Sequence, residues 1–361
     1  EIASGKPRRM FFALLLSLVP PPRLALLGDY VAPAELHDAL TTEWTLRPYS
    51  NASSEEIASA IAFVQTPLTQ LDNAAAGLLY QYSFTGYAEN DLAQIPPSFT
   101  VANCHQASSA IAEYVLAAML HWTVKLDAMD AALRQCTWKT APPGNQDCAS
   151  ARIIHRQISN MTLGVLGYGH IGEAIATRAH AFGTRTIATT LNPPTVVPSP
   201  LAWIGDDTKN AQLFAESDFV VVCTPLLNTT VGLVDADLLA HLSPTAVILN
   251  IARGAIIDED ALYSALVSRA IGGAVIDVWW QSISQLPEGG VGPDAWPSKY
   301  RFDKLDNVIM SAHTSGNTDE AHAEALQEVA QNLDLLANDE PLLNVVRNGT
   351  LLQSYETHNN W

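Results

Sequence analysis

The chain has 361 residues, enough for two domains of roughly 150 residues each, and 48% of them are hydrophobic. Asp and Glu number 37 against 19 Lys and Arg, so the net charge of −18 repels nucleic-acid phosphates and anionic membrane surfaces. We therefore expect a folded protein with a large core and no nucleic-acid or membrane partner.

Residues 6–19 are open to two interpretations, because a basic start precedes an apolar run. This order resembles a signal peptide, which would make the protein a secreted one. No small-residue cleavage site follows, and an α/β pattern continues after it, so we favour a buried first strand over Phe11–Leu16 and a cytoplasmic protein. No apolar run approaches the ~20 residues that span a bilayer. The position of the natural N-terminus stays open.

Up to about residue 104, short apolar runs alternate with helical patterns, which predicts a parallel sheet. We expect strands at Phe11–Leu16, Ala62–Gln65, Leu79–Phe84 and Phe99–Cys104, and helices at Ala34–Leu40 and Ser54–Ile61. An Ala-rich pattern over residues 108–134 then predicts one long helix that could link two domains.

A cleaner alternation begins after the loop at residues 141–145. Strands are predicted at Leu163–Leu166, Thr186–Thr190, Phe219–Cys223, Ala246–Ile251, Ala274–Val278 and Val308–Ala312, with helices between most of them. Near-continuous apolar runs of this kind are typical of a parallel sheet that is buried on both faces. A last helix at Asp319–Asn338 and an extended tail at Pro341–Val346 complete the pattern.

The four cysteines match no known spacing of metal ligands. Cys104, Cys136, Cys148 and Cys223 lie too far apart for a zinc motif and are too few for a dense disulfide framework. We expect buried or idle thiols and no metal site.

A glycine-rich turn follows the predicted strand Leu163–Leu166 and opens a predicted helix at Glu173–Phe182. The turn consists of Gly167, Tyr168, Gly169, His170, Ile171 and Gly172. In this setting the first glycine allows a tight turn, the second lets a pyrophosphate approach the backbone, and the third lets the helix pack on the strand. Free N–H groups at the helix start bind the anion. The pattern indicates a dinucleotide-binding site.

The end of the second strand of this domain bears on the choice between NAD and NADP. An acidic residue there binds the ribose hydroxyls in NAD enzymes, but Thr190 stands in its place. Without the carboxylate a 2′-phosphate is not repelled, yet no Arg or Lys occurs in residues 191–207 to attract one. The sequence therefore leaves NAD and NADP open.

Five short motifs occur in a characteristic order along the chain. They are the turn at 167–172, Val222–Leu226 with Thr230, Leu249–Gly254, Ile276–Val278 and Ser311–Gly316, and Gly86, Asn103, Ala112, Glu113 and Trp138 accompany them. Together they resemble the D-isomer-specific 2-hydroxyacid dehydrogenase family, which includes glyoxylate and hydroxypyruvate reductases, phosphoglycerate dehydrogenase and, more distantly, formate dehydrogenase. The resemblance covers nearly the whole chain.

The resemblance implies an α/β fold of two doubly wound parallel-sheet domains. A Rossmann dinucleotide domain at residues 119–317 would be inserted into a flavodoxin-like substrate domain made of residues 1–118 and 318–361. The active site would lie in the cleft between the domains. Many relatives are homodimers with a long interdomain helix at the interface, so we expect a homodimer.

The same resemblance implies two catalytic residues. Arg253 ends a predicted strand, and its guanidinium would bind the substrate carboxylate bidentately and polarise the adjacent carbonyl. His313 ends the last strand and would give a proton to the ketone oxygen in reduction and take it back in oxidation. The chain would then interconvert a small 2-oxo acid and its D-2-hydroxy acid, with glyoxylate or hydroxypyruvate slightly favoured.

Further residues would bind the substrate and the cofactor. Backbone N–H groups of Ser83, Phe84, Thr85 and Gly86 would hold the substrate carboxylate. Asp277 would accept a hydrogen bond from the nicotinamide carboxamide. The remaining cofactor-binding positions that the resemblance implies are Cys223, Thr224, Pro225, Thr230, Ile251, Ala252, Ser315 and Gly316.

The chain departs from the family at the partner of the catalytic histidine. Most members place a Glu where this chain has Ser282, and that Glu favours the imidazolium. Without it we expect the pKa of His313 to stay near ~6.5, and reduction to be faster at mildly acidic pH. The loop at 289–301 is longer than is usual in the family.

Two other functions remain to be weighed. Formate dehydrogenases pair their His with a Gln, but Gln281 and Gln285 do not stand at the matching offset, and Ala107 occupies the position of the formate-binding Asn, so formate is disfavoured. Alternatively, the chain could be a sensor or scaffold that binds a dinucleotide without turnover. The presence of both Arg253 and His313 favours catalysis.

Overall fold

The computed structural model describes residues 23–87, 89–139, 149–150, 153–281 and 296–352. The strand predicted at Phe11–Leu16, residue Ser282 and most of the long loop at 289–301 lie outside these residues. No helix in the described ranges combines the length and the apolar composition that crossing a bilayer requires.

The chain divides into two compact units, each described here by itself. Of the described residues, the first unit contains those up to Ser83, Gln94–Asn103 and those from Leu326 onward, and the second contains Phe84–Ala93 and Cys104–Ala325. Along the chain, the first unit changes to the second after Asn103. The reason is that the helix following Asn103 packs into the core of the second unit.

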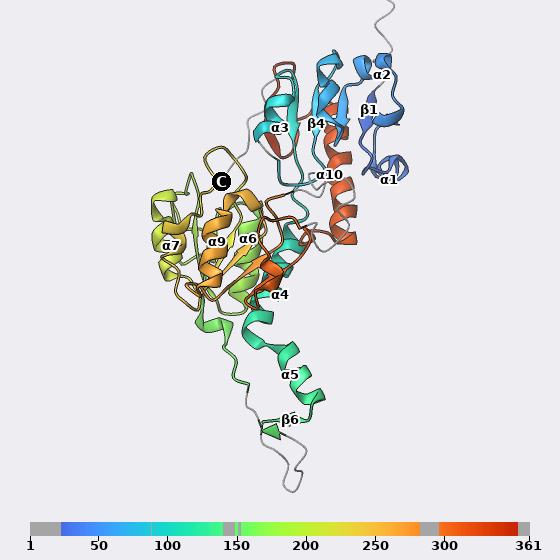
Figure 1. The fold of residues 1–361 in the computed structure, drawn as a ribbon. Helices are drawn as coiled ribbons and strands as arrows, with labels where there is room; N and C mark the ends of the chain where they lie inside the picture. The colour runs from blue at the N-terminus through green and yellow to red at the C-terminus, as the bar shows by residue number, and fades with distance from the viewer. Residues whose placement is uncertain (1–22, 88, 140–148, 151–152, 282–295, 353–361) are drawn as a thin grey trace, which may run out of the picture. The chain divides into compact units, whose positions relative to one another are not determined.

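The first unit contains a six-stranded sheet in the order β15-β5-β4-β3-β1-β2 (Figure 1). Its strands are β1 (Leu24–Leu27), β2 (Thr45–Pro48), β3 (Ala62–Val64), β4 (Leu79–Gln81), β5 (Thr100–Ala102) and β15 (Val345–Arg347), and its short helices are α1 (Pro33–Ala39) and α2 (Ser54–Ser59). All neighbours are parallel except β15, which is antiparallel to β5. The order 2-1-3-4-5 is the flavodoxin-like one, as predicted.

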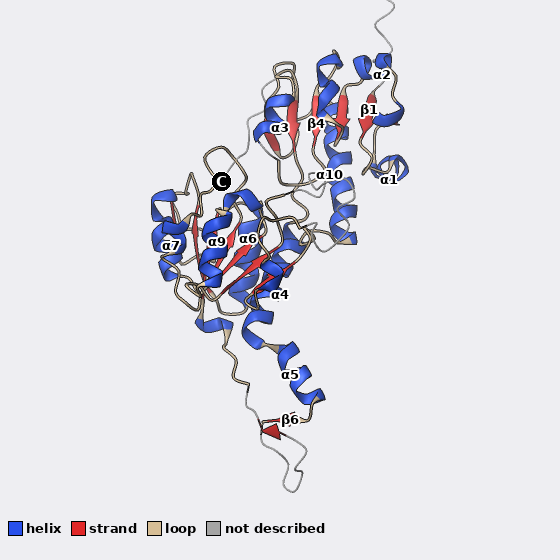
Figure 2. Ribbon diagram, in the orientation of Figure 1, coloured by secondary structure: helices blue, strands red, loops and turns tan. Residues whose placement is uncertain are grey.

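The second unit contains a seven-stranded parallel sheet in the order β10-β9-β8-β11-β12-β13-β14 (Figure 2). Its strands are β8 (Thr162–Leu166), β9 (Arg185–Thr189), β10 (Trp203–Gly205), β11 (Phe219–Val222), β12 (Val247–Asn250), β13 (Gly273–Ile276) and β14 (Val308–Met310). This is the Rossmann order, with the reversal between β8 and β11. The predicted α/β fold of two doubly wound sheets is confirmed.

The helices of the second unit are α4 (Ser108–Val124), α5 (Leu126–Arg134), α6 (His170–Ala181), α7 (Asn210–Glu216), α8 (Ala236–Leu239) and α9 (Glu259–Val267). Two helices, α3 (Glu89–Gln94) and α10 (Asp319–Ala337), run from one unit into the other along the chain. A short ladder pairs β6 (Thr137–Trp138) with β7 (Ala149–Ser150).

Side chains of the second sheet alternate between two hydrophobic clusters, one on each face. On β11, Phe219 and Val221 face the cluster with α4 and α6, whereas Val220 and Val222 face the cluster with α7, α8 and α9. Full burial of each such side chain stabilises the fold by about 1.5–3 kcal/mol. This two-sided burial explains why the strands are almost continuously apolar in sequence.

Two predictions about local structure were wrong. The single helix predicted over residues 108–134 is two helices, because Lys125 adopts a left-handed conformation with φ 59° and ends α4. Cys136 is disulfide-bonded, not an idle thiol. Cys104 and Cys223 are thiols, as expected, and Cys148 lies outside the described residues.

Candidate active site

The predicted site residues of the second unit gather at one edge of its sheet. Because β8, β11, β12, β13 and β14 are parallel, their carboxyl ends lie at the same edge. The residues that follow these strands are Gly167, Cys223, Ile251, Asp277 and Ser311. Ligands of doubly wound domains bind at this edge, beside the reversal of strand order.

The glycine turn has a geometry that suits an anion at the start of α6. Gly167 has φ 97°, and an added Cβ would lie 2.6 Å from the Thr224 nitrogen. Gly169 is the N-cap of α6, and an added Cβ there would meet no atom within 4 Å. The turn is therefore tight where it packs against the β11 loop and open where a pyrophosphate would approach the helix N-terminus.

The other predicted cofactor residues occupy loops around this turn. Thr190 follows β9, and its N–H donates to the carbonyl of Gly205 at 3.0 Å. The Thr230 hydroxyl donates to the carbonyl of Pro225 at 2.7 Å, which shapes the loop after β11. Burial raises the pKa of the Cys223 thiol, so that side chain is uncharged.

His170, in the turn, stacks on His105 from the segment before α4. The ring centroids are 4.0 Å apart and the planes differ by 23°. Burial, reinforced by the charge of His170, lowers the pKa of His105 to about 4. His105 is therefore neutral at physiological pH.

The side chain of Asn250, at the end of β12, shapes the turn that carries Arg253. Its amide nitrogen donates to the carbonyl of Arg253 at 2.9 Å, and its oxygen accepts from the N–H of Ala252 at 3.1 Å. Because Asn250 is only 1% exposed, this turn is held from within the domain.

The Arg253 guanidinium is half-buried and is held by two carbonyls. It donates to Ala252 at 2.7 Å and to Gly86 at 2.8 Å. Burial lowers its pKa, while the negative charge of Asp91 opposes that shift. An added Cβ at Gly86 would lie 2.3 Å from the Arg253 Nη2 atom, so a side chain there would displace the guanidinium.

The structure thus brings one of the four predicted substrate-binding residues to Arg253. Phe84, Thr85 and Gly86 belong to the second unit, as Arg253 does. Ser83 belongs to the first unit, where its N–H donates to the side-chain oxygen of Gln65 at 3.3 Å.

His313 lies in a loop that is organised around the buried Asp277. Its φ is 58°, a left-handed conformation that is uncommon for any residue but glycine. The N–H of His313 donates to the Asp277 carbonyl at 2.7 Å. The N–H groups of Thr314 and Ser315 donate to the Asp277 carboxylate at 2.9 and 3.0 Å, and the Ser311 hydroxyl donates to it at 2.5 Å.

These contacts influence the pKa values of Asp277 and His313. Burial alone would raise the pKa of Asp277, but the hydrogen bonds from Ser311, Ser315 and Thr314 outweigh it and hold the pKa below its ordinary range. Burial and the nearby charge of Arg253 lower the pKa of His313, and the charge of Asp277 opposes them. The expectation that this pKa stays near its ordinary value was therefore wrong, because it considered only the missing Glu.

Sequence reasoning missed the residues that support the site. Asn250 positions the Arg253 turn, and the Trp279 indole N–H donates to the Ser311 carbonyl at 2.8 Å. Tyr114, on α4, lies within hydrogen-bond distance of the Ser311 hydroxyl. Asn250 and Ser311 stand inside the recognised motifs and could have been noticed there. Tyr114 lies far away in sequence and carried no signal.

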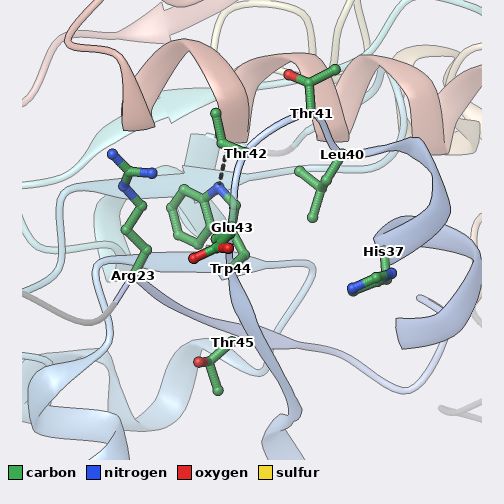
Figure 3. A pocket seen from close by; sticks show the side chains of 8 residues that line it. All are labelled: Arg23, His37, Leu40, Thr41, Thr42, Glu43, Trp44 and Thr45. Carbon is green, nitrogen blue, oxygen red and sulfur yellow. Dashed lines mark hydrogen bonds between the residues drawn. The ribbon is translucent and has the colours of Figure 1, made fainter.

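An open pocket of about 620 Å³ lies elsewhere, in the first unit (Figure 3). Its lining residues are Arg23, His37, Leu40, Thr41, Thr42, Glu43, Trp44 and Thr45. The Arg23 guanidinium already donates to the carbonyl of Ala337 at 2.8 Å. No predicted site residue lines this pocket, so the grouping of reactive side chains, not pocket size, identifies the candidate site.

Comparison with known proteins agrees with the family resemblance that the sequence motifs indicate. Residues 116–315 match the family described as "D-isomer specific 2-hydroxyacid dehydrogenase, NAD binding domain". D-3-phosphoglycerate dehydrogenase of Mycobacterium tuberculosis is 28% identical over 86% of this chain and 56% of its own length. Glyoxylate reductase of Thermococcus onnurineus is 34% identical over 50% of this chain and 49% of its own length. The chain thus spans about half the length of these relatives.

A solved structure extends the likeness to the fold. The D-isomer specific 2-hydroxyacid dehydrogenase of Xanthobacter autotrophicus, in complex with NADPH and MES, aligns with a TM-score of 0.73 over 91% of this chain and 98% of its own, at 22% identity. The matched family domain binds NAD, which agrees with a site for NAD or NADP in the second unit. Since the family match covers more than half of its residues, the chain belongs to the D-isomer-specific 2-hydroxyacid dehydrogenase family.

Proposed function

We propose that this protein is an NAD(P)-dependent oxidoreductase that interconverts a small 2-oxo acid and its D-2-hydroxy acid. One observation carries the proposal: Arg253 follows β12 and His313 follows β14, so both stand at the carboxyl edge of the same parallel sheet, where the charge of Arg253 lowers the pKa of His313. A cation that binds a carboxylate and an imidazole that transfers a proton must be neighbours, because a 2-oxo acid carries both groups on adjacent carbons.

Each residue has a defined task in this reaction. The nicotinamide, when bound, supplies the hydride for reduction and accepts it in oxidation. Arg253 binds the substrate carboxylate with its remaining N–H groups, while the carbonyls of Gly86 and Ala252 orient the guanidinium. His313 gives its proton to the ketone oxygen during reduction and removes it from the hydroxyl during oxidation.

The cofactor would occupy the second unit. The turn at 167–172 and the loop after β11 follow the two strands that flank the switch point of the sheet, where dinucleotides bind, and Thr190 follows the neighbouring strand β9. The loop at 315–316 follows β14 at the same edge. We assign the dinucleotide-binding role to residues 119–317 and the substrate-binding role to residues 1–118 and 318–361. A nicotinamide contact of Asp277 would require its carboxylate to add to the three hydrogen bonds that it already accepts.

Glyoxylate or hydroxypyruvate is the favoured acid. The supporting relative is the glyoxylate reductase, which matches the chain at 34% identity. We also propose a homodimer. Its support is the apolar surface of α5 and β6, where Leu126, Leu133 and Trp138 are 66, 51 and 47% exposed.

The test is the loss of NADH or NADPH absorbance with glyoxylate, hydroxypyruvate, pyruvate and longer 2-oxo acids. Arg253→Ala and His313→Ala should each abolish most of the turnover. His241→Ala and Arg269→Ala serve as controls, because both side chains are exposed in the second unit and neither lies on α5 or β6. Tight dinucleotide binding without turnover of any acid would contradict the proposal and favour the sensor.

A further inference from the structure

A chain of hydroxyl groups links α4 to the loop that carries His313. The Tyr114 hydroxyl lies 2.6 Å from the Ser311 hydroxyl, which lies 2.5 Å from a carboxylate oxygen of Asp277. Asp277 has no exposed surface, and Tyr114 is half-buried. All four residues belong to the second unit. This series of hydrogen bonds therefore ends at the buried carboxylate of Asp277, which also accepts hydrogen bonds from the loop that carries the proposed proton donor.

The direction of each hydrogen bond follows from the available protons. Asp277 accepts from the N–H groups of Thr314 and Ser315, and the hydrogen bonds hold its pKa low, so it is an ionised acceptor. The single Ser311 proton must then point to Asp277, and the Tyr114 hydroxyl must donate to the Ser311 oxygen. Burial raises the pKa of Tyr114, the hydrogen bond with Ser311 lowers it, and the charge of Asp277 raises it. The net shift is upward, so the phenol keeps its proton.

The Asp277 carboxylate in turn sets the backbone of the loop. Three consecutive N–H groups, those of residues 313–315, donate to Asp277. The left-handed conformation of His313 costs on the order of 1 kcal/mol or more and persists only where its surroundings hold it. A rotation of the carboxylate would release two of the three N–H groups.

We propose that Tyr114 is a positioning residue: through Ser311 it fixes the Asp277 carboxylate, and through Asp277 it holds His313 in the conformation that transfers the proton. The proposal rests on the proposed function, for which it names a further residue. Tyr114 itself touches neither the substrate nor the reacting atoms.

The electrostatic consequence can be measured. Among the residues that the structure describes, two charged side chains act on the pKa of His313: Arg253 lowers it and Asp277 raises it. If Ser311 and Tyr114 no longer hold the Asp277 carboxylate in place, its charge should raise the pKa of His313 by less.

The experiment compares Tyr114→Phe with Tyr263→Phe, a second half-buried tyrosine of the same unit whose ring stacks on Tyr300. For Tyr114→Phe we expect kcat of reduction to fall about tenfold, or about 1.4 kcal/mol. The midpoint of the pH profile of kcat/KM should move to lower pH, while dinucleotide affinity stays unchanged. Tyr263→Phe should match the original protein. An equal loss of rate at every pH with the midpoint in place would overturn the proposal, because it would indicate a structural role only.

A second measurement does not depend on turnover. The imidazole protons of His313 are titrated by NMR without substrate, and the signal is assigned by its loss in His313→Gln. The titration midpoint should be lower in Tyr114→Phe and in Ser311→Ala, and the double variant should shift no further than Ser311→Ala. If the protein reduces no 2-oxo acid, the proposed function fails while this titration still decides the role of Tyr114. An identical midpoint in Tyr114→Phe and the original protein would overturn that role.

Discussion

Gly86 leaves no room for a side chain beside the Arg253 guanidinium. In Gly86→Ala the new methyl group would lie 2.3 Å from Nη2 and displace the guanidinium from the carbonyl that orients it. We expect KM for the 2-oxo acid to rise at least tenfold, by about 1.4 kcal/mol of lost binding. Steady-state kinetics measure the rise.

The control for this prediction is dinucleotide affinity, which should not change because Gly86 lies outside the glycine turn. Arg253→Lys should raise KM in the same direction, since an ammonium cannot form the bidentate contact. A Gly86→Ala protein with the original KM would show that Arg253 does not depend on this neighbour.

The pH dependence of the reaction follows from His313. Its pKa lies below the ordinary value of 6.5, so the imidazole is mostly neutral at pH 7. Reduction requires the imidazolium and should therefore accelerate as the pH falls below 7. Oxidation requires the neutral ring and should keep its rate from neutral pH upward. Profiles of kcat/KM in both directions test this, and a reduction rate that is maximal above pH 8 would contradict it.

At the scale of elements, Asp334 ties helix α10 to the segment before β2. Its carboxylate accepts from the backbone N–H and the hydroxyl of Thr41, and from the same two groups of Thr42. Thr42 also accepts from the Trp44 indole, the bond drawn as a dashed line in Figure 3. One helix residue thus satisfies four donors of a loop that carries no regular structure.

We expect Asp334→Ala to lower the free energy of unfolding at pH 7 by about 1–3 kcal/mol, measured by denaturant titration. Burial would raise the pKa of Asp334, but the hydrogen bonds from Thr41 and Thr42 outweigh it and lower the pKa. A lowered pKa means that the stabilisation is present above the unfolded value of ~3.9 and is lost as the pH falls through the folded value. The two proteins should therefore converge in stability in strong acid.

Asp72→Ala is the matched control, because Asp72 is an exposed aspartate of the same unit. It should change the free energy of unfolding by no more than about 0.5 kcal/mol. Equal effects of the two substitutions would mean that the contacts with Thr41 and Thr42 contribute nothing.

The sequence predicted elements well where burial imposes a pattern. β8, β11, β12 and β13 are buried on both faces and were found, although their ends shifted by a residue or more. β1 lies between β2 and β3 in the first sheet but was missed, since its four apolar residues follow a proline run. The break at Lys125 was missed because apolar residues recur on both sides of it, so no local signal marks the turn.

For the candidate site, the sequence predicted the residues that stand in short motifs but not the long-range contacts that support them. Arg253, His313 and the glycine turn stand in motifs whose chemistry is local to the sequence. The hydrogen bonds from Ser311 and Tyr114 join residues that are distant in the chain, so they become visible only in the fold. The lowered pKa of His313 likewise depends on a charge from another strand end.

At the scale of the whole molecule, the residues proposed to bind the dinucleotide are not shared between the two units. Every residue assigned to the dinucleotide lies in the second unit, and the first sheet contributes none. The net charge of −18 also means that an anionic cofactor must be bound by local groups, since the protein as a whole repels it. The N-terminus of α6 is the described feature best suited to that task.

Hydrogen exchange with and without NADH or NADPH tests this division. A dinucleotide at 100 times its Kd stabilises the state that binds it by about 2.7 kcal/mol, which slows exchange through the opening of that unit about a hundredfold. Amides of β8, α6 and β11 should show this slowing, and Gly167→Ala should abolish it, because the added methyl group meets the Thr224 backbone at φ 97°. Amides of β3 and β4, in the first sheet, should exchange at unchanged rates. Equal slowing in both sheets would contradict the assignment of the cofactor to the second unit, whereas slowing confined to β8, α6 and β11 would locate binding at the carboxyl edge where Arg253 and His313 also lie.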